Sequence, residues 1–155
     1  MSGRRGPASG GHSARYRRRG PKNGAHGPRV PRPAVAERLE TVELLLSGSV
    51  SDAGGLWSRA TAWILRIALE QSVDELWLRV APALVRCPMR AQLIALRAFA
   101  GPDIAARVAV LWAALSRAAH HHDYELAPSV TELRRWCEQT LALATELEAV
   151  AAHRG

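Results

Sequence analysis

Residues 102–124 read PDIAARVAVLWAALSRAAHHHDY and join a regular apolar pattern to an unusual polar cluster. The pattern has apolar side chains at steps of three and four residues, the spacing of one face of an α-helix. These side chains are Ile104, Val108, Leu111 and Leu115. Gly101 and Pro102 predict a turn before the helix, and Asp103 suits its first turn, where a carboxylate stabilises the helix dipole. The stretch therefore predicts an amphipathic helix that runs into the polar segment 116–124.

On the N-terminal side the sequence predicts two more helices at the same spacing. The first has its apolar face at Val35, Leu39, Val42 and Leu46. The second is long, covers about residues 53–80, and ends before Pro82. Its apolar stripe is expected to begin with Leu56, Ala60, Trp63 and Ile67 and to continue with Leu69, Val73, Leu76 and Val80.

Two further helices complete the predicted architecture. Pro88 opens one of them, and Ser129 with Glu132 has the capping-box pattern that begins the last. No stretch alternates with period two, so a β-sheet is not expected. Amphipathic helices joined by short turns pack best as an all-α, up-and-down bundle of four to five helices.

The net charge of +7 comes from the N-terminal segment. Its 33 residues hold nine basic and no acidic side chains, whereas the remainder holds twelve basic and fourteen acidic ones. A segment rich in Gly, Pro and Arg buries too little apolar surface to fold, so we expect a disordered tail over 1–33 and a helical domain over 34–153. The tail is either a solvated extension, an over-extended start of the reading frame, or a basic arm that touches phosphates.

Composition excludes several classes of protein. Apolar residues make up 48% of the 155 residues and charged residues 23%, which is usual for a globular domain. Cys87 and Cys137 form no CxxC pair, so neither a disulfide framework nor a thiol–metal motif is expected. No apolar run reaches the roughly 18 residues of a membrane span, and no apolar segment follows the basic start as in a secretory signal. We therefore expect a cytoplasmic protein with no membrane partner.

Five tryptophans all fall inside predicted helices: Trp57, Trp63, Trp77, Trp112 and Trp136. Such residues can stack on nucleic-acid bases. At helical spacing they more often pack in a core or a dimer contact, which is the interpretation favoured here.

The polar segment has the side chains for phosphoryl transfer. A guanidinium such as Arg117 can grip two phosphate oxygens, and an imidazole such as His122 can move a proton near neutral pH. These two side chains converge only if the helix unwinds around His121. Asp123 or Tyr124 could then orient an imidazole or bond the substrate.

Other interpretations of the segment stay open. Three successive histidines can simply form a polar helix end, and their side chains point about 100° apart, so no metal site is expected. Arg117 could form an exposed ion pair with Asp123 or Glu125.

The spacing Arg117-x4-His122, late in an all-α chain, resembles the Arg-x(4–6)-His motif of the HEPN superfamily (higher eukaryotes and prokaryotes nucleotide-binding). The text from Leu115 to Pro128 is similar to an actinobacterial branch of that superfamily. So are Arg59-Ala60-Thr61-Ala62-Trp63 and Met89-Arg90-Ala91-Gln92-Leu93. The resemblance covers roughly residues 54–147 and leaves out the basic tail.

The resemblance implies a HEPN-like helical bundle that forms a homodimer with two motif copies at its interface. It implies a metal-independent endoribonuclease of the toxin, defence or RNA-processing type, with no cofactor and with an antitoxin partner such as a nucleotidyltransferase-fold protein. By this resemblance Arg117 binds the scissile phosphate and His122 transfers a proton. His120, His121, Asp123 and Tyr124 are then auxiliary or substrate-binding residues.

One position departs from the family pattern. Active members usually carry a polar residue directly after the motif arginine, and this chain has Ala118 there. The departure favours the alternative of a non-catalytic module that binds a nucleotide, RNA or a protein, unless His120 or His121 fills the role. A nucleic-acid-binding protein driven by the tail alone is the third hypothesis.

Overall fold

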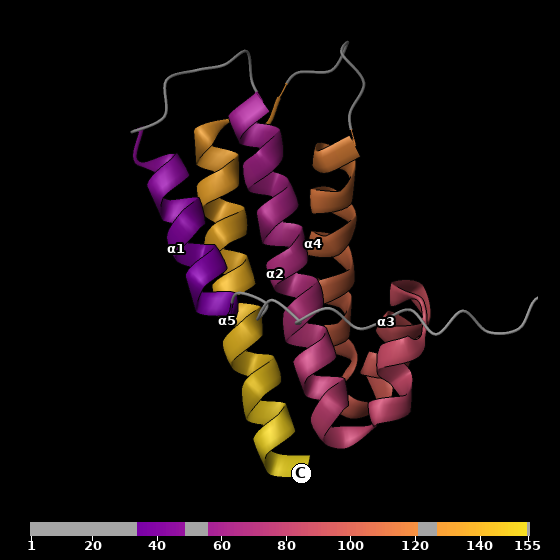
Figure 1. Cartoon of the computed structure of the whole chain (residues 1–155). Coiled ribbons are helices and arrows are strands. Elements are labelled where there is room, and N and C mark those ends of the chain that lie inside the picture. The colour runs from indigo at the N-terminus through magenta and orange to yellow at the C-terminus, as the bar shows by residue number, and fades with distance from the viewer. Residues whose placement is uncertain (1–33, 49–55, 121–126, 155) are drawn as a thin grey trace, which may run out of the picture. The chain divides into compact units, whose positions relative to one another are not determined.

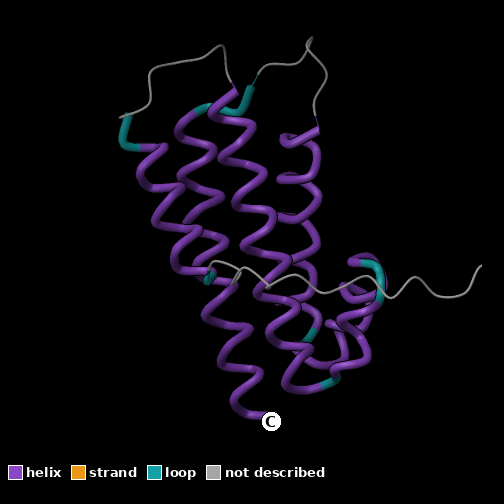
Figure 2. The backbone as a smooth tube through the Cα atoms, in the orientation of Figure 1, coloured by secondary structure: helices purple, strands orange, loops and turns teal. Residues whose placement is uncertain are grey.

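The computed structural model describes residues 34–48, 56–120 and 127–154. All of them belong to one compact unit. It contains five α-helices: α1 (Val35–Leu46), α2 (Leu56–Val80), α3 (Met89–Ala100), α4 (Pro102–His120) and α5 (Val130–Arg154). A short 3-10 helix, η1 (Pro82–Arg86), follows α2. The described residues contain no strand (Figure 2), so the predicted all-α helical bundle is confirmed.

Helix α2 is the centre of the bundle. It packs against α5, α4 and α1, while α3 packs mainly against α4. Figure 1 shows α1, α2, α4 and α5 side by side, with α3 beside the end of α4 where that helix begins. Helix α2 is continuous from Leu56 to Val80, as the single long helix predicted there requires.

The turns and caps follow the local sequence. Gly101 separates α3 from α4 with φ of 86°, a left-handed conformation that favours glycine. Pro88 lies one position earlier than expected, because it caps α3 rather than beginning it. Ser129 caps α5 as predicted, since its hydroxyl accepts a hydrogen bond from the Glu132 amide at 3.2 Å.

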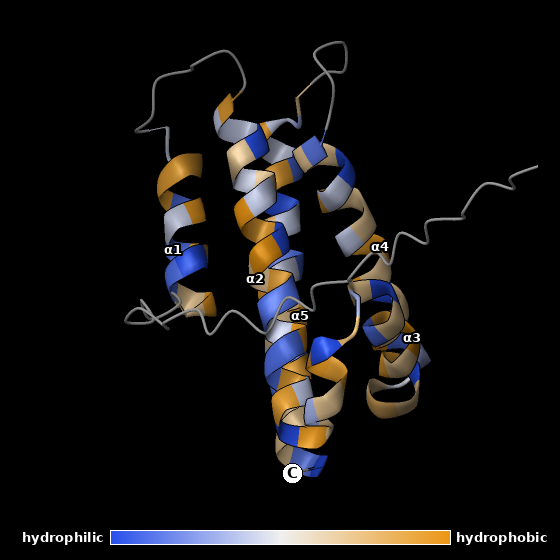
Figure 3. Cartoon of the chain, turned by 45° about the vertical axis from the view of Figure 1, so that its right-hand side comes forward, coloured by the Kyte–Doolittle hydropathy of each residue, from blue (hydrophilic) through white to orange (hydrophobic). Residues whose placement is uncertain are grey.

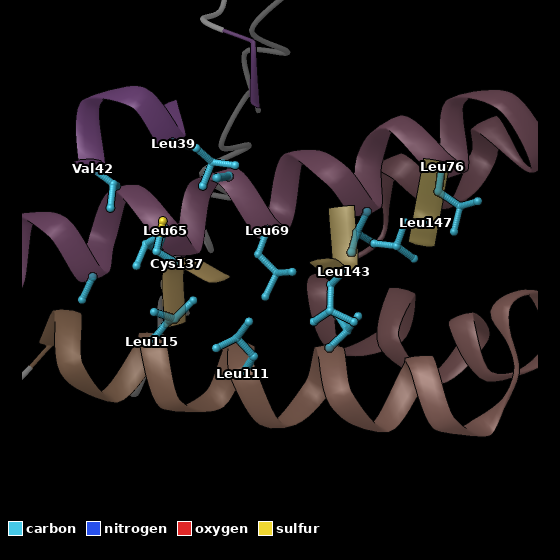
Figure 4. Packing of buried hydrophobic residues seen from close by; sticks show 14 of the residues in the cluster. Leu39, Val42, Leu65, Leu69, Leu76, Leu111, Leu115, Cys137, Leu143 and Leu147 are labelled. Atoms are coloured by element: carbon cyan, nitrogen blue, oxygen red, sulfur yellow. The ribbon is translucent and has the colours of Figure 1, made fainter. Parts of the chain in front are cut away.

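The core lies between α2, α4 and α5, with α1 closing one side. Leu65 and Leu69 of α2 face Leu111 and Leu115 of α4 (Figure 4), and all four are almost completely buried. Residues predicted to line the apolar face of α4 therefore do so. Apolar and polar stretches alternate along the helices (Figure 3), as amphipathic helices of a bundle require.

The first half of α2 corrects the sequence prediction. Leu56 and Trp63 are 64% and 53% exposed, so the expected stripe faces outward there. The buried face instead mixes small and hydroxyl-bearing residues with leucines: Ser58, Thr61, Ala62, Leu65, Ala68, Leu69 and Ser72. Thr61 and Ser72 donate their hydroxyls to the carbonyls of Trp57 and Ala68, four residues earlier, at 2.7 and 2.9 Å. Burial therefore leaves those two hydroxyls with partners.

The length and apolar character of the described helices decide whether one of them could cross a membrane. None of them is long and apolar enough to span a bilayer.

Candidate functional site: the end of helix α4

The predicted site residues fall partly inside the described chain. Arg117 lies in the last turn of α4 and His120 is the last residue of that helix. His121, His122, Asp123 and Tyr124 lie outside the described residues. The convergence of Arg117 and His122 therefore stays a prediction.

Arg117 is exposed and lines a groove between α4 and α5 of about 840 Å³. No carboxylate within the described ranges pairs with it. The same is true of Arg135 on α5, which lines the same groove. Among the described residues, both guanidiniums therefore line the groove without a carboxylate partner.

The floor of the groove is apolar, and the arginine on its far rim is paired with a carboxylate. The floor is built from small and apolar side chains of both helices: Val110, Leu111, Ala114, Trp136, Ala142 and Leu143. On the rim, Arg107 donates two hydrogen bonds of 2.8 Å to Glu146. Those hydrogen bonds lower the pKa of Glu146 below its ordinary value. The groove arginines that have no carboxylate partner in the described chain therefore lie nearer the end of α4 than its beginning.

Ala118 faces the protein interior. It is 5% exposed and belongs to the core cluster with Leu115. A polar side chain at this position would enter apolar surroundings, so the helix register itself favours a small apolar residue directly after Arg117.

His120 contacts α2 instead of the groove. Its Nε2 lies 2.9 Å from an amino nitrogen of Arg66, which comes from the middle of α2. A guanidinium can only donate hydrogen bonds, so His120 Nε2 accepts in this contact and its proton is assigned to Nδ1.

Arg66 is held in place by two further groups. Its Nε donates to Glu70 Oε1 at 2.8 Å, and the indole N–H of Trp112 donates to the same oxygen at 2.8 Å. The guanidinium carbon lies 5.8 Å from the centre of the Trp112 ring, within cation–π range. Arg66, Glu70, Trp112 and His120 thus form one connected cluster, here called the α2–α4 cluster.

Sequence reasoning missed Arg66 and Glu70. Their spacing of four residues indicates a helical ion pair, but nothing local predicts that His120, 54 positions later, contacts Arg66. Trp112, Ser116 and His120 are also four apart and lie along one side of α4, a signal that could have grouped them.

Metal ligands do not gather in this region. Within residues 34–48, 56–120 and 127–154, no group of three or more His, Cys, Asp or Glu side chains could hold a metal ion.

Comparisons of the chain with protein-family models, with curated proteins and with solved structures gave no match.

Proposed function

We propose that this protein is a metal-independent endoribonuclease of the HEPN type, acting in toxin, defence or RNA-processing systems. The observation that carries the proposal is Arg117, an exposed guanidinium without an ion-pair partner in the described chain, at the mouth of a groove. A buried or paired arginine would be structural. This one is free to bind a phosphate, with the motif histidine five residues later.

The reaction needs only the RNA and two side chains. The 2′-oxygen attacks the adjacent phosphorus as its proton passes to a base, and the 5′-oxygen leaves and takes up a proton. The products are a 2′,3′-cyclic phosphate and a 5′-hydroxyl. Arg117 stabilises the negative charge that builds on the phosphoryl oxygens, and His122 transfers a proton.

The α4–α5 groove is the surface on which we place a second copy of the chain. Val110 in this groove is 71% exposed and lies among other apolar side chains that a second copy could cover. The groove also carries Arg117 and Arg135 beside Glu132 and Glu138, so a two-fold related copy can offer acids to bases. Such a dimer brings two copies of Arg117 close together. A neutralising nucleotidyltransferase-fold partner would belong to the same proposal.

The test is cleavage of a mixed RNA pool by the purified full chain in EDTA. We expect Arg117→Ala and His122→Ala each to lower the cleavage rate by about 10²-fold or more. Arg97→Ala is the matched control, because it removes an equal charge from the exposed last turn of α3. Equal activity in Arg117→Ala and Arg97→Ala would contradict the assignment.

A second candidate is a module that binds RNA, a nucleotide or a protein without cleaving it. The buried Ala118 favours it, because no polar side chain follows Arg117 directly. In this case the RNA pool is bound but stays intact, and Arg117→Ala lowers affinity without any change in cleavage.

A further inference from the structure

We propose that the α2–α4 cluster is a second phosphate-binding site, in which Arg66 and His120 together hold a phosphoryl group. The identification of that group as part of an RNA substrate rests on the function proposed above. The phosphate site itself is argued from the contacts of the cluster.

The contacts of Arg66 hold its guanidinium in one orientation. Glu70 accepts the hydrogen bond of its Nε–H, and the guanidinium carbon lies over the Trp112 ring, 5.8 Å from the ring centre. Glu70 is in turn fixed by the indole N–H of Trp112. A guanidinium held in one orientation loses less conformational freedom when it binds a phosphate with two parallel hydrogen bonds.

Arg66 has hydrogen-bond donors that Glu70 does not occupy. Glu70 occupies only the Nε–H of Arg66, and one amino nitrogen faces His120 at 2.9 Å. The other amino nitrogen bonds no acceptor within the described residues. A guanidinium can bind an oxyanion through two parallel hydrogen bonds. Among the described residues, the hydrogen-bond partner of the Arg66 amino groups is the His120 ring, whose own N–H is a further donor.

Arg66 and His120 can be reached from solvent, and the charges around them favour an anion. The Arg66 side chain is 23% exposed and His120 is exposed at the end of α4. Arg117 is three residues from His120, so a second guanidinium lies less than one helical turn away. Glu70 is the one carboxylate that contacts Arg66 in the described chain. The local balance therefore favours an anion.

An unsatisfied hydroxyl lies on the same side of α4. Ser116 is four residues from both Trp112 and His120, and its Oγ is buried with no hydrogen-bond partner in the part of the chain that the structure describes. The spacing of four residues places Ser116 on the side of α4 that carries Trp112 and His120.

The positions of Arg117 and of the α2–α4 cluster suggest how RNA would lie. Arg117 faces the α4–α5 groove and His120 contacts α2, so the two residues lie on neighbouring sides of α4. We infer that one phosphate of the RNA binds at Arg117 and a neighbouring phosphate binds at Arg66 and His120. The second contact would then position the strand without taking part in bond cleavage.

The experiment is a titration of the full chain with inorganic phosphate at constant ionic strength, followed by NMR. The signals are the Trp112 indole N–H, assigned with Trp112→Phe, and the His120 ring. We expect both to shift and to saturate. Arg66→Ala should lose the saturable shift, and His120→Ala should weaken phosphate binding about tenfold, as measured at the Trp112 signal.

Arg79→Ala is the control, because Arg79 is an exposed arginine at the other end of the same helix. It should bind phosphate as the unaltered protein does. Circular dichroism checks that Arg66→Ala is folded, and Arg66→Lys, which keeps the charge but loses the paired donors, should bind phosphate more weakly in any case. Absence of a saturable shift, or equal binding by Arg66→Lys and the unaltered protein, would overturn the site.

A second titration identifies the source of the phosphate. Uridine 3′-monophosphate should bind more tightly than inorganic phosphate if the group belongs to RNA, and equal binding would overturn that assignment. The two proposals fail separately. Cleavage that needs Arg117 but no phosphate shift at Trp112 refutes only the second site. Phosphate binding at Arg66 without any cleavage refutes only the nuclease.

Discussion

The thiol of Cys137 shows at the scale of one residue how position sets chemistry. It is 6% exposed and its sulfur lies 3.6 Å from Glu43 Oε1. Burial, together with the charge of Glu43, raises the pKa of Cys137 to about 11. The thiolate is the reactive form, so Cys137 is unreactive near neutral pH.

We therefore predict slow alkylation of Cys137 in the folded protein. In a Cys87→Ser background, iodoacetamide at pH 8 should modify Cys137 far more slowly in the folded chain than in urea, and the folded rate should rise steeply towards pH 11. The free energy of unfolding should fall over the same range, because the raised pKa stabilises the fold below about pH 9 and this contribution is lost by about pH 11. Equal rates with and without urea at pH 8 would contradict the prediction.

The contrast between Arg117 and Arg107 is also a matter of single residues. Both line the groove on α4, but Arg107 is bound by Glu146 and, at 3.5 Å, by Asp103. Their positions ten residues apart on α4 decide which of them faces carboxylates. A ligand-binding role therefore follows from the helix register and the neighbours on α5, which sequence inspection of α4 alone does not reveal.

At the scale of elements, the buried leucines of α4 are the strongest link between sequence and fold. We predict that Leu115→Ala lowers the free energy of unfolding by about 2–5 kcal/mol, because Leu115 is fully buried and its loss leaves a cavity. Leu141→Ala is the control, since Leu141 on α5 is 55% exposed. Urea denaturation measures both, and similar losses would show that α4 does not pack as described.

The helices could be predicted because their apolar spacing and their turn residues agree. The apolar period of 102–120, Gly101 and the Ser129 cap each specify a local structure, and each is found. The outward face of early α2 could not be predicted. Apolar residues occur on both sides of the first half of α2, so their spacing does not identify the buried side. Thr61 and Ser72 also appear polar in the sequence, although the hydrogen bonds of their hydroxyls to backbone carbonyls permit burial.

The candidate site could be predicted only in part for a different reason. Arg117 and His120 are three residues apart in the sequence, so their proximity can be predicted directly. Arg66 and Glu70 join them only because α2 and α4 pack side by side, and that pairing depends on tertiary contacts. The predicted site residues include His120 but not Arg66, Glu70 or Trp112, the other members of the cluster.

At the scale of the whole molecule, the proposed dimer depends on the α4–α5 face. We predict that Val110→Glu shifts the protein from dimer to monomer, because it places a charge on the apolar floor of the groove. Ile94→Glu is the matched control, since Ile94 on α3 is 79% exposed and lies outside the groove. Sedimentation velocity distinguishes the two. A monomeric unaltered protein, or a dimer that survives Val110→Glu, would contradict this interface.

We propose that Arg117 stabilises the phosphoryl group while the 2′-hydroxyl of RNA attacks it, and the products of the cleavage assay test this role most directly. One labelled oligoribonucleotide and its 2′-deoxy counterpart are incubated with the full chain in EDTA, and the ends are identified by mass spectrometry. We predict 2′,3′-cyclic phosphate and 5′-hydroxyl ends from RNA, intact DNA, and neither product with Arg117→Ala. Cleavage of the deoxy strand, ends carrying a 5′-phosphate, or unchanged products from Arg117→Ala would contradict the account.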